Sequence, residues 1–470
     1  MNVSDSERLA GYLEGLGFVW TDKRDKADVV ITTTCGVRQS AEDRVYGLVP
    51  KIKKENPKSI TIVTGCLAGR EDVQKRLKES VDIWLPITDL YKLGKLLSSR
   101  CRTPIIGVRH RERGIPKYDS LSGYLIINPR YGSSISAFVP IGNGCNNFCA
   151  YCVVPYARGR EVYRPAEEIL TEVKGLVKKG HKEIVLIAQN VNSYSSRINR
   201  ELKANEHKST FSRIKTSPQP SPGQGEGERE RFLLVPPHMR GKQGEINFAQ
   251  LLRMVNDIPG NFWIRFATSH PKDMSEELIK TIAECEHVCH QIHLPAQAGD
   301  NKVLAKMNRK YTREHYLGLI KKIRQAMPDA AISTDIIVGF PGETKQQFKN
   351  SEKLFREAKF DMAYTAQYSP RPGTAAAKFK DDVAKAEKKR REEALLKILR
   401  KTARANNFSY LHKTIDVLVE GKNKNIYFGK SATGKTVKIA DQIKGGSVGK
   451  VIPVRITEAR DFGLTGRMVK

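Results

Sequence analysis

The 470-residue sequence predicts an α/β protein made of three successive units. Two regions alternate short apolar runs with helical patterns, which is typical of parallel sheets covered by helices. The third region, near the C-terminus, alternates apolar and polar residues one by one, as antiparallel strands do. We therefore expect a small doubly wound N-terminal domain, a partial (β/α)6 barrel and a C-terminal antiparallel β-barrel.

The first unit, residues 1–97, has the rhythm of a βαβ fold. Its expected strands are 28–33, 59–64 and 81–85, and its expected helices are 4–16, 39–54, 70–79 and 88–97. Cys35 and Cys66 each lie two residues beyond the C-terminal end of an expected strand. Open α/β sheets bind their ligands at that edge, so both cysteines are candidate site residues.

The second unit, residues 135–375, repeats this rhythm on a larger scale. Its expected strands are 137–141, 183–188, 262–267, 288–294, 331–338 and 362–368. Such strands form a partial barrel whose reactive groups lie on the loops at the C-terminal strand ends. Residues 197–243 interrupt it between the second strand and its helix, and their low-complexity composition predicts a disordered insertion.

The remaining chain divides into a helix and a β-barrel. Residues 376–407 are rich in Lys, Arg and Glu and predict a solvated linking helix, and residues 408–470 predict the β-barrel. Residues 429–436 fit the phosphate-binding pattern G-x₄-G-K-[ST], but that site needs a helix after it and the next residues alternate as a strand. We interpret this segment as a hairpin in which Lys430 and Lys435 are candidates for RNA phosphate contacts.

The charge balance indicates a polyanionic partner. Lysine and arginine number 81 against 51 acidic residues, which gives a net charge of +30. Nucleic acid is favoured over a membrane surface, although charge alone does not distinguish tRNA, rRNA and DNA. No apolar run approaches the ~18 residues of a membrane span, and the polar N-terminal residues lack a signal pattern. We therefore expect a cytoplasmic protein whose clustered cysteines bind metal rather than form disulfides.

Three cysteines at C-x₃-C-x₂-C spacing form the most informative motif, on a loop directly after the first barrel strand. The motif comprises Cys145, Cys149 and Cys152, with the aromatic residues Phe148 and Tyr151 between them. Three thiolates can bind three irons of a [4Fe–4S] cube and leave the fourth iron open to another ligand. A structural zinc site would need a fourth ligand nearby, and the next histidine, His181, lies beyond an expected helix. The motif resembles that of the radical S-adenosylmethionine (SAM) enzymes, in which SAM chelates the open iron.

Several further residues are candidates for binding this cofactor or RNA. Those at C-terminal ends of expected strands are Gln189, Asn190, Ser269, Gln297, Asp335, Gly339, Gly342 and Glu343. Singly, each such residue is more often part of a turn, but their shared position favours one SAM site that also includes Phe148 and Tyr151. The arginines just beyond the cysteines, Arg158, Arg160 and Arg164, are candidates for phosphate contacts or form a solvated basic face.

Several segments together resemble the MiaB-type tRNA methylthiotransferases. They are residues 144–161, 189–194, 265–271, 293–299 and 335–343, and the resemblance covers the chain apart from 197–243. It implies an N-terminal domain with an auxiliary [4Fe–4S] cluster, a radical SAM barrel and an RNA-binding barrel called TRAM. It also implies that a sulfur held at the auxiliary cluster is methylated by one SAM. A second SAM is cleaved at the other cluster, and C2 of N6-isopentenyladenosine at tRNA position 37 receives the methylthio group.

The N-terminus departs from this family pattern. The auxiliary cluster of the family uses three cysteines, and Cys35 and Cys66 match the second and third of them. The segment that would carry the first cysteine should end before Met1, which suggests a start placed too far downstream. We expect a complete radical SAM cluster but an unstable auxiliary one, hence SAM cleavage with little methylthiolation. Iron analysis that returned about eight irons per chain would contradict this expectation.

Related functions and partners stay open from the sequence. The alternative substrates are threonylcarbamoyladenosine in tRNA and a ribosomal protein, and a truncated, non-catalytic RNA-binding form is a third alternative. The expected partners are tRNA, a reductant protein such as flavodoxin or ferredoxin, and a sulfur donor. Segments 189–194 and 268–271 favour the branch of the family that acts on tRNA.

Overall fold

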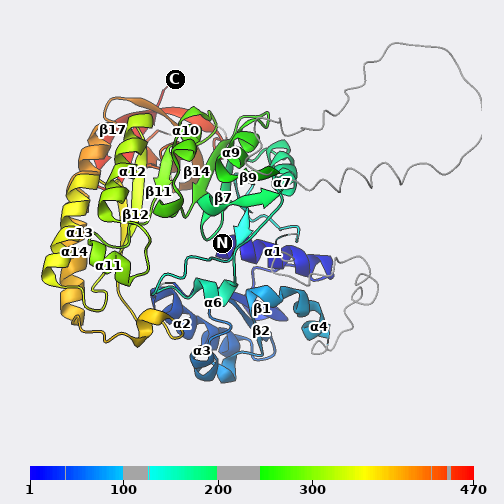
Figure 1. Ribbon diagram of the computed structural model, residues 1–470. Coiled ribbons are helices and arrows are strands. Elements are labelled where there is room, and N and C mark those ends of the chain that lie inside the picture. The colour runs from blue at the N-terminus through cyan, green and yellow to red at the C-terminus, as the bar shows by residue number, and fades with distance from the viewer. Residues whose placement is uncertain are drawn as a thin grey trace, which may run out of the picture.

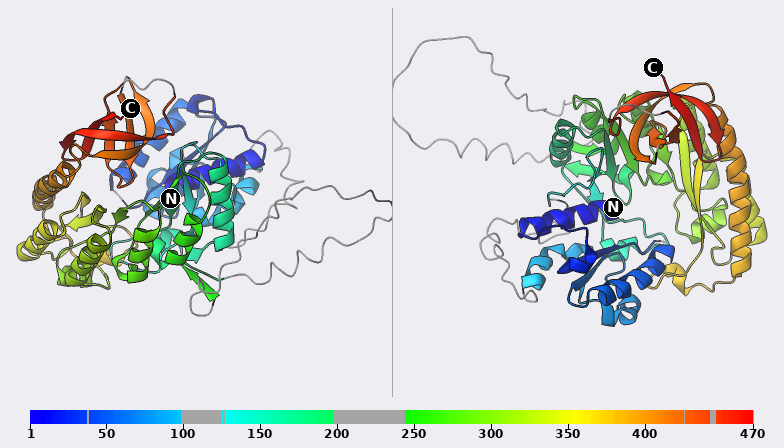
Figure 2. Two further views of the ribbon diagram at one scale, coloured as in Figure 1. Left: turned by 90° about the horizontal axis from the view of Figure 1, so that it is seen from above. Right: turned by 180° about the vertical axis from the view of Figure 1, so that it is seen from behind.

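The computed structural model describes residues 1–37, 39–98, 125, 127–197, 244–424, 426–441 and 446–469. These residues form an α/β N-terminal unit, a central barrel and a C-terminal β-barrel, so the predicted fold class is confirmed. The N-terminal unit and the C-terminal β-barrel lie at opposite ends of the central barrel (Figures 1 and 2). Apart from Arg197, the predicted disordered insertion lies outside the described residues.

The N-terminal unit is a three-stranded parallel sheet flanked by helices. Its strands, in sheet order, are β1 (Val29–Thr34), β2 (Ile60–Gly65) and β3 (Ile83–Leu85). Its helices are α1 (Asn2–Gly15), η1 (Arg24–Lys26), α2 (Gln39–Glu55), α3 (Glu71–Arg76), η2 (Lys78–Ser80), η3 (Ile87–Lys92) and α4 (Leu93–Ser98). Because β1 ends at Thr34 and β2 at Gly65, Cys35 and Cys66 directly follow two paired strands. The predicted edge position of both cysteines is therefore confirmed.

The central barrel contains six parallel strands in two sheets. In chain order they are β4 (Ser136–Pro140), β7 (Glu183–Ile187), β10 (Trp263–Ala267), β11 (Gln291–His293), β12 (Ala331–Val338) and β13 (Met362–Gln367). One sheet has the order β10-β7-β4 and the other β11-β12-β13, and an isolated bridge between Ile264 and Val288 joins them. Strand β11 is shorter than expected because Val288 makes only this bridge. The arrangement is the predicted partial barrel, with β4 and β13 at its two edges.

Helices cover the outside of the barrel, and a short antiparallel pair closes the start of the cysteine loop. The elements are β5 (Gly142–Asn143), α6 (Val154–Arg158), β6 (Val162–Tyr163), α7 (Ala166–Lys178), η5 (Val191–Ser193), β8 (Ser195–Arg197), β9 (Glu245–Asn247), α9 (Phe248–Asn256), η8 (Pro271–Asp273), α10 (Glu276–Glu284), α11 (Asn301–Lys306), α12 (Arg313–Ala326), α13 (Lys345–Ala358), η9 (Ala375–Lys378) and α14 (Lys385–Phe408). On β12, Ile332, Ile336 and Val338 are buried, whereas Ser333 and Asp335 alternate with them and are half-buried. This period of two puts apolar side chains in the core and leaves polar ones on the other face.

Helix α14 corrects the prediction of a solvated linking helix. Its buried residues are Lys388, Arg391, Leu395, Leu399, Ala403 and Asn407, which recur at helical spacing on one face. The helix packs on β13 and α13 and thus belongs to the wall of the barrel. Its charge-rich sequence does not indicate burial, but Arg391 and Lys388 are buried because they form ion pairs with Glu343 and Asp381.

The C-terminal unit is the predicted β-barrel; it is closed by five strands, and one neighbouring pair is parallel rather than antiparallel. The strands are β14 (Thr414–Asn423), β15 (Ile426–Ser431), β16 (Thr436–Ile439), β17 (Val451–Arg460) and β18 (Gly463–Met468), in the order β14-β15-β16-β18-β17. The segment that fits the phosphate-binding pattern is the turn between β15 and β16, so rejection of that site is confirmed. Its Gly434 has φ +73°, and a Cβ there would lie 2.3 Å from the Gln291 amide carbon of the central barrel. Glycine is therefore required where this turn meets the barrel.

Candidate iron–sulfur and cofactor site

The cysteine loop begins where β4 ends and is fixed at its start by backbone contacts. Gly144 has φ +82°, and a Cβ on it would lie 2.0 Å from the Arg160 carbonyl oxygen. The Cys145 amide donates to the Gly159 carbonyl at 3.1 Å. Only glycine permits this close approach of two chain segments, so Gly144 sets the direction in which the cysteines leave the strand.

The middle of the loop is held by two later segments of the barrel. The Ala150 amide donates to the Met307 carbonyl at 2.9 Å, and the Ala150 carbonyl accepts from the Ala376 amide at 2.7 Å. Asn308 Nδ2 donates to the Phe148 carbonyl at 2.9 Å. Phe148 itself has φ +46°, an uncommon conformation for a residue with a side chain. These bonds fix the loop without using any of its three thiols.

The three thiols of the loop fit a cluster better than a single metal ion. All three are free, and burial raises the pKa of the Cys152 thiol to about 12, with Cys149 and Cys145 adding to the shift. Within the described residues, no group of three or more His, Cys, Asp and Glu side chains is placed to hold one metal ion. A cube binds each thiolate through a different iron, so the sulfurs need not converge on one point. The half-buried thiols would become thiolates on binding iron.

An arginine that sequence reasoning missed touches this cluster site. Arg309 Nη1 donates to Cys149 Sγ at 3.4 Å and Nη2 donates to the Pro295 carbonyl at 3.0 Å. Its Nε donates to the Tyr311 hydroxyl at 2.9 Å, and the side chain is almost fully buried. Neighbouring phenol and thiol groups raise its pKa further above the ordinary value, against the effect of burial, so it is a fixed positive charge beside Cys149. Arg309 lies outside the five segments on which the family resemblance was based, so no motif marked it.

Three candidate SAM-binding residues present buried oxygens that lack a partner. Gln189 Oε1, Asn190 Oδ1 and Ser269 Oγ are all inaccessible and unbonded in the structure. They follow β7 and β10, which are neighbours in the sheet, and so lie at one C-terminal edge. Asn190 Nδ2 is fixed by Asp273 Oδ2 at 2.7 Å. Buried polar atoms rarely lack partners, so this edge fits a polar ligand such as SAM.

The other predicted cofactor residues have more varied surroundings. Asp335 Oδ2 lies 3.3 Å from His293 Nε2 on the adjacent strand, and the Gln297 amide donates to the Asp335 carbonyl at 2.8 Å. Gly339 and Gly342 have φ +68° and +78° and form the turn after β12. Glu343 uses one carboxylate oxygen, Oε2, to accept from the Gly339 amide at 2.6 Å and from Arg391 Nη1 at 2.7 Å. These bonds brace the turn, and the role of Glu343 in binding a cofactor stays a prediction.

Cys35 and Cys66 lie beside the loop of the other three cysteines. The Cys66 amide donates to the Thr34 carbonyl at 3.1 Å, which brings the two strand ends together. A Cβ on Gly36 would lie 3.2 Å from Cys66 Cβ and 3.1 Å from the Val153 side chain. Cys66 also contributes to the raised pKa of Cys152. The two groups of cysteines, predicted from separate units of the chain, therefore face one another.

The predicted RNA-contacting residues are mostly committed to other partners. Arg158 is buried and bonds Asp5 of α1, Arg164 is buried and bonds Glu172 of α7 at 2.6 Å, and Lys435 is buried against Asp361. These three assignments to phosphate contact are corrected, since a buried and paired cation cannot reach a phosphate. Arg160 is exposed, as the prediction requires. Lys430 is 42% exposed and bonds Glu420 at 2.7 Å.

Comparison with known proteins agrees with this geometry. Residues 139–355 match the family described as the Radical SAM superfamily, and residues 1–86 match the Uncharacterized protein family UPF0004. A solved structure with a related description is the radical S-adenosylmethionine methyltransferase TsrM from Kitasatospora setae. It shows 13% identity and a TM-score of 0.48, over 80% of this chain and 73% of that one. The barrel, the cysteine loop and the family match define a radical SAM enzyme.

Curated relatives identify the family more closely. The chain is 42% identical to the tRNA-2-methylthio-N(6)-dimethylallyladenosine synthase of Clostridium novyi, over 100% of this chain and 94% of the relative. It is 38% identical to the synthase of the same name from Clostridium botulinum, with 95% of that protein covered. It is 39% identical to that of Thermoanaerobacter pseudethanolicus, with 91% covered. The chain belongs to the family of tRNA-2-methylthio-N(6)-dimethylallyladenosine synthases.

Proposed function

We propose that this chain replaces the C2 hydrogen of N6-isopentenyladenosine at position 37 of tRNA with a methylthio group. The observation that carries the proposal is the meeting of two cysteine groups, Cys145/Cys149/Cys152 and Cys35/Cys66, at the C-terminal end of the barrel. The first group provides three ligands for the radical SAM cluster, and the second provides ligands for an auxiliary [4Fe–4S] cluster. No observation favours threonylcarbamoyladenosine or a ribosomal protein as the substrate.

The bound groups supply chemistry that side chains cannot. A [4Fe–4S] cluster with SAM supplies a 5′-deoxyadenosyl radical, which can react at an aromatic C–H that no base deprotonates. Gln189, Asn190 and Ser269 offer oxygens to the polar groups of SAM, while Gly339 and Gly342 permit the positive φ values of the neighbouring turn. Arg309 holds Cys149 in place and keeps a positive charge beside it.

His270 keeps the surroundings of the site free of a further positive charge. Burial lowers the pKa of its imidazole to about 2, with Arg309 and Lys272 adding to the shift. Its Nδ1 accepts from the Lys272 amide at 3.1 Å, so the proton of the neutral ring is on Nε2. The ring packs edge-on against Tyr311 at 5.7 Å between centroids. His270 therefore orients neighbouring groups and does not titrate near neutral pH.

The partners follow from charge and chemistry. The net charge of +30 suits tRNA, and it also suits an acidic electron carrier such as flavodoxin or ferredoxin. A hollow on the C-terminal barrel is lined by the exposed cations Arg404, Lys438 and Arg460, which replace Lys435 as candidates for RNA contact. Methylthiolation consumes one sulfur per product, so a sulfur donor is also required. No helix in the described part of the chain is long and apolar enough to cross a bilayer. We place the reaction in the cytoplasm because its tRNA substrate is there.

The test is nucleoside mass spectrometry of tRNA. A strain that lacks its own methylthiotransferase and accumulates N6-isopentenyladenosine should form the 2-methylthio nucleoside when it expresses this chain, in small amount because Cys35 and Cys66 match only two of the family's three auxiliary-cluster cysteines. Cys149→Ala should form none, and purified, anaerobically reconstituted protein should release 5′-deoxyadenosine under dithionite. Unchanged N6-isopentenyladenosine with a methylthiolated threonylcarbamoyladenosine, or no new nucleoside at all, would contradict the proposal.

A further inference from the structure

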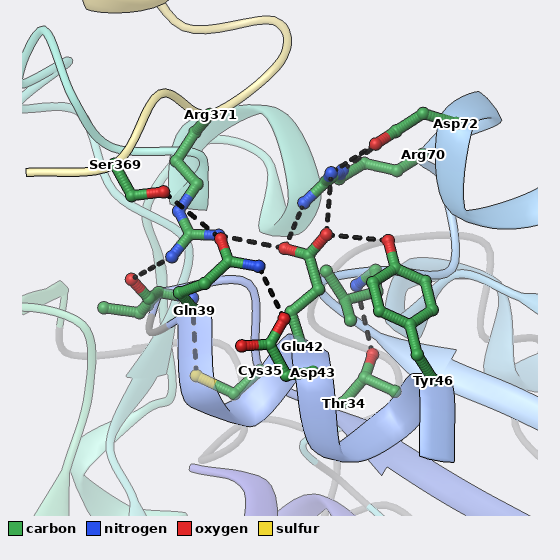
Figure 3. Close-up of polar contacts among 12 residues, drawn as sticks. Thr34, Cys35, Gln39, Glu42, Asp43, Tyr46, Arg70, Asp72, Ser369 and Arg371 are labelled. Carbon is green, nitrogen blue, oxygen red and sulfur yellow. Dashed lines mark hydrogen bonds and ion pairs between the residues drawn. The ribbon is translucent and has the colours of Figure 1, made fainter. Parts of the chain in front are cut away.

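One short segment contacts the chain next to both groups of cysteines. Residues 368–376, here called the bridging segment, follow the last barrel strand, β13. At its end, the Ala376 amide donates to the Ala150 carbonyl, which lies between Cys149 and Cys152. Near its middle, Arg371 reaches the N-terminal unit, where Cys35 lies (Figure 3). The segment therefore connects the radical SAM loop to the strand edge of the auxiliary site.

Arg371 grips the chain immediately after Cys35 with a forked set of bonds. Its Nη2 donates to the Val37 carbonyl at 3.3 Å. Its Nη1 donates to Gln39 Oε1 and to Glu42 Oε2, each at 2.9 Å. Ser369 of the same segment adds a bond from its hydroxyl to Gln39 Oε1 at 3.2 Å. A guanidinium can bind several acceptors in a fixed geometry, which a lysine ammonium cannot do as rigidly.

Glu42 makes this contact costly to break. Its carboxylate also accepts from Arg70 at 2.7 and 3.1 Å and from the Tyr46 hydroxyl at 2.8 Å, as Figure 3 shows. The Glu42 and Arg371 side chains are only 5% and 7% exposed. Loss of Glu42 would leave the buried Arg371 without its carboxylate, whereas loss of Arg371 leaves Glu42 its pair with Arg70. The pair thus favours one relative placement of the two units over others.

We propose that Arg371 and Glu42 are positioning residues that hold the Cys35–Cys66 edge at a fixed place relative to the radical SAM loop. The proposal rests on the proposed function, because that reaction joins a methylthio group from one cysteine site to a carbon activated at the other. A misplacement of about 1 Å between reacting groups can cost about 10²-fold in rate. Radical formation at Cys145, Cys149 and Cys152 does not need this alignment, whereas transfer of the methylthio group does.

Other contacts keep the two units together when this one is lost. Asp5 bonds Arg158, and Arg8 bonds Glu172 at 3.2 Å, so α1 stays attached to the barrel by independent buried ion pairs. Removing the Arg371 side chain should therefore shift the Cys35 edge without releasing the N-terminal unit. The expected defect is uncoupling, in which SAM is cleaved but the methylthio group is not transferred.

The experiment compares Arg371→Gln, Arg371→Lys and a matched control in the full chain. The control is Arg313→Gln, which removes an ion pair with Glu357 that joins two barrel helices. For each protein we would measure iron per chain, 5′-deoxyadenosine, methylthiolated tRNA and hydrogen exchange of amides 43–49, the first bonded amides of α2. Arg371→Gln should keep its iron content, lower the ratio of methylthiolated product to 5′-deoxyadenosine about ten-fold or more, and speed exchange at 43–49.

The outcomes separate this proposal from the proposed function. Arg371→Lys should fall between the parent and Arg371→Gln, because it keeps the charge and loses the fork. The positioning role is overturned by a product ratio within two-fold of the parent, by an equal fall in Arg313→Gln, or by faster exchange throughout residues 1–98. If the parent protein cleaves SAM but makes no methylthiolated tRNA, the proposed function fails. The exchange at 43–49 then decides the positioning role alone.

Discussion

The two ends of the central barrel differ in what the buried polar groups of the neighbouring strands β7 and β10 contact. At the N-terminal ends of the strands, Arg265 bonds Glu183 and donates to the carbonyls of Ser431 at 2.7 Å and Ala432 at 3.0 Å. At the C-terminal ends, oxygens of Gln189 and Ser269 are buried without a partner. Satisfied polar groups stabilise a contact between parts of the chain, whereas unsatisfied ones are free to bind a ligand. One end thus carries the β-barrel and the other end carries the candidate site.

The largest effect should come from the cysteines themselves. Cys149→Ala should abolish both SAM cleavage and methylthiolation, because it removes a ligand of the cluster with the open iron. Cys66→Ala should retain SAM cleavage and lose methylthiolation, since it alters only the auxiliary site. Chromatography of 5′-deoxyadenosine and mass spectrometry of tRNA nucleosides measure the two activities. Loss of SAM cleavage in Cys66→Ala would show that the two sites do not divide the reaction in this way.

At the opposite end, loss of Arg265 should affect stability but not SAM. Arg265→Met leaves the carboxylate of Glu183, whose side chain is 5% exposed, buried without its cation. We expect the free energy of unfolding to fall by about 3–5 kcal/mol, measured from the urea midpoint, with no change in the SAM dissociation constant of the folded protein. The control Arg253→Gln removes a half-exposed pair with Glu284 and should lower the free energy of unfolding far less, because solvent screens that pair. A weakened SAM affinity in Arg265→Met would contradict the functional separation of the two ends of the barrel.

Arg309 should tune the reduction potential of the radical SAM cluster. A positive N–H donor at Cys149 Sγ stabilises the more negative, reduced cluster. Arg309→Gln should therefore lower the midpoint potential, by about 50 mV if the bond is worth slightly over 1 kcal/mol. Redox titration followed by electron paramagnetic resonance measures this potential independently of turnover. Arg309→Lys should shift the midpoint potential less. An unchanged potential in both variants would show that Arg309 only packs against the loop and does not tune the cluster.

The smallest effect should have opposite signs for stability and binding. Ser269→Ala removes a buried hydroxyl that has no partner, so the free energy of unfolding should rise by about 1 kcal/mol. The same change should weaken SAM binding about five-fold if the hydroxyl bonds the cofactor. The control Ser275→Ala removes the cap that accepts from the Leu278 amide at 3.1 Å, and should lower stability by about 1 kcal/mol without affecting SAM. Thermal melts and equilibrium dialysis of SAM provide the two measurements.

Regular periodicity made most of the fold predictable. The expected strand 331–338 coincides with β12, and the alternation after Thr436 correctly predicted β16. The misplaced assignments concern charged side chains whose partners are distant in sequence. Arg158 pairs with Asp5, and Lys435 pairs with Asp361, so nothing in their local sequence indicates burial. A basic residue near a motif can be recognised as part of a buried ion pair only when the structure shows its acidic partner.

The part of the candidate site in which chemistry requires a fixed spacing of residues in the sequence could be predicted. The part that depends on contacts between distant residues could not. Three cysteines within eight residues announce a cluster, whereas Arg371 and Glu42 are 329 residues apart and belong to no motif. Glu343 ends a family-like segment, but nothing in that segment indicates that one of its carboxylate oxygens bonds its own turn. Positioning residues of this kind become visible only through the contacts that the folded chain makes.

The small antiparallel pair β8–β9 makes the barrel tolerant of what is joined to it. Arg197 lies opposite Glu245 and Ser195 opposite Asn247, so backbone pairing already holds these two chain segments side by side. Closing a longer loop between fixed ends costs only about 0.6 kcal/mol for each doubling of its length. This hairpin base is therefore a natural splice point, at which a reporter or an affinity handle could be inserted while the catalytic scaffold keeps its shape.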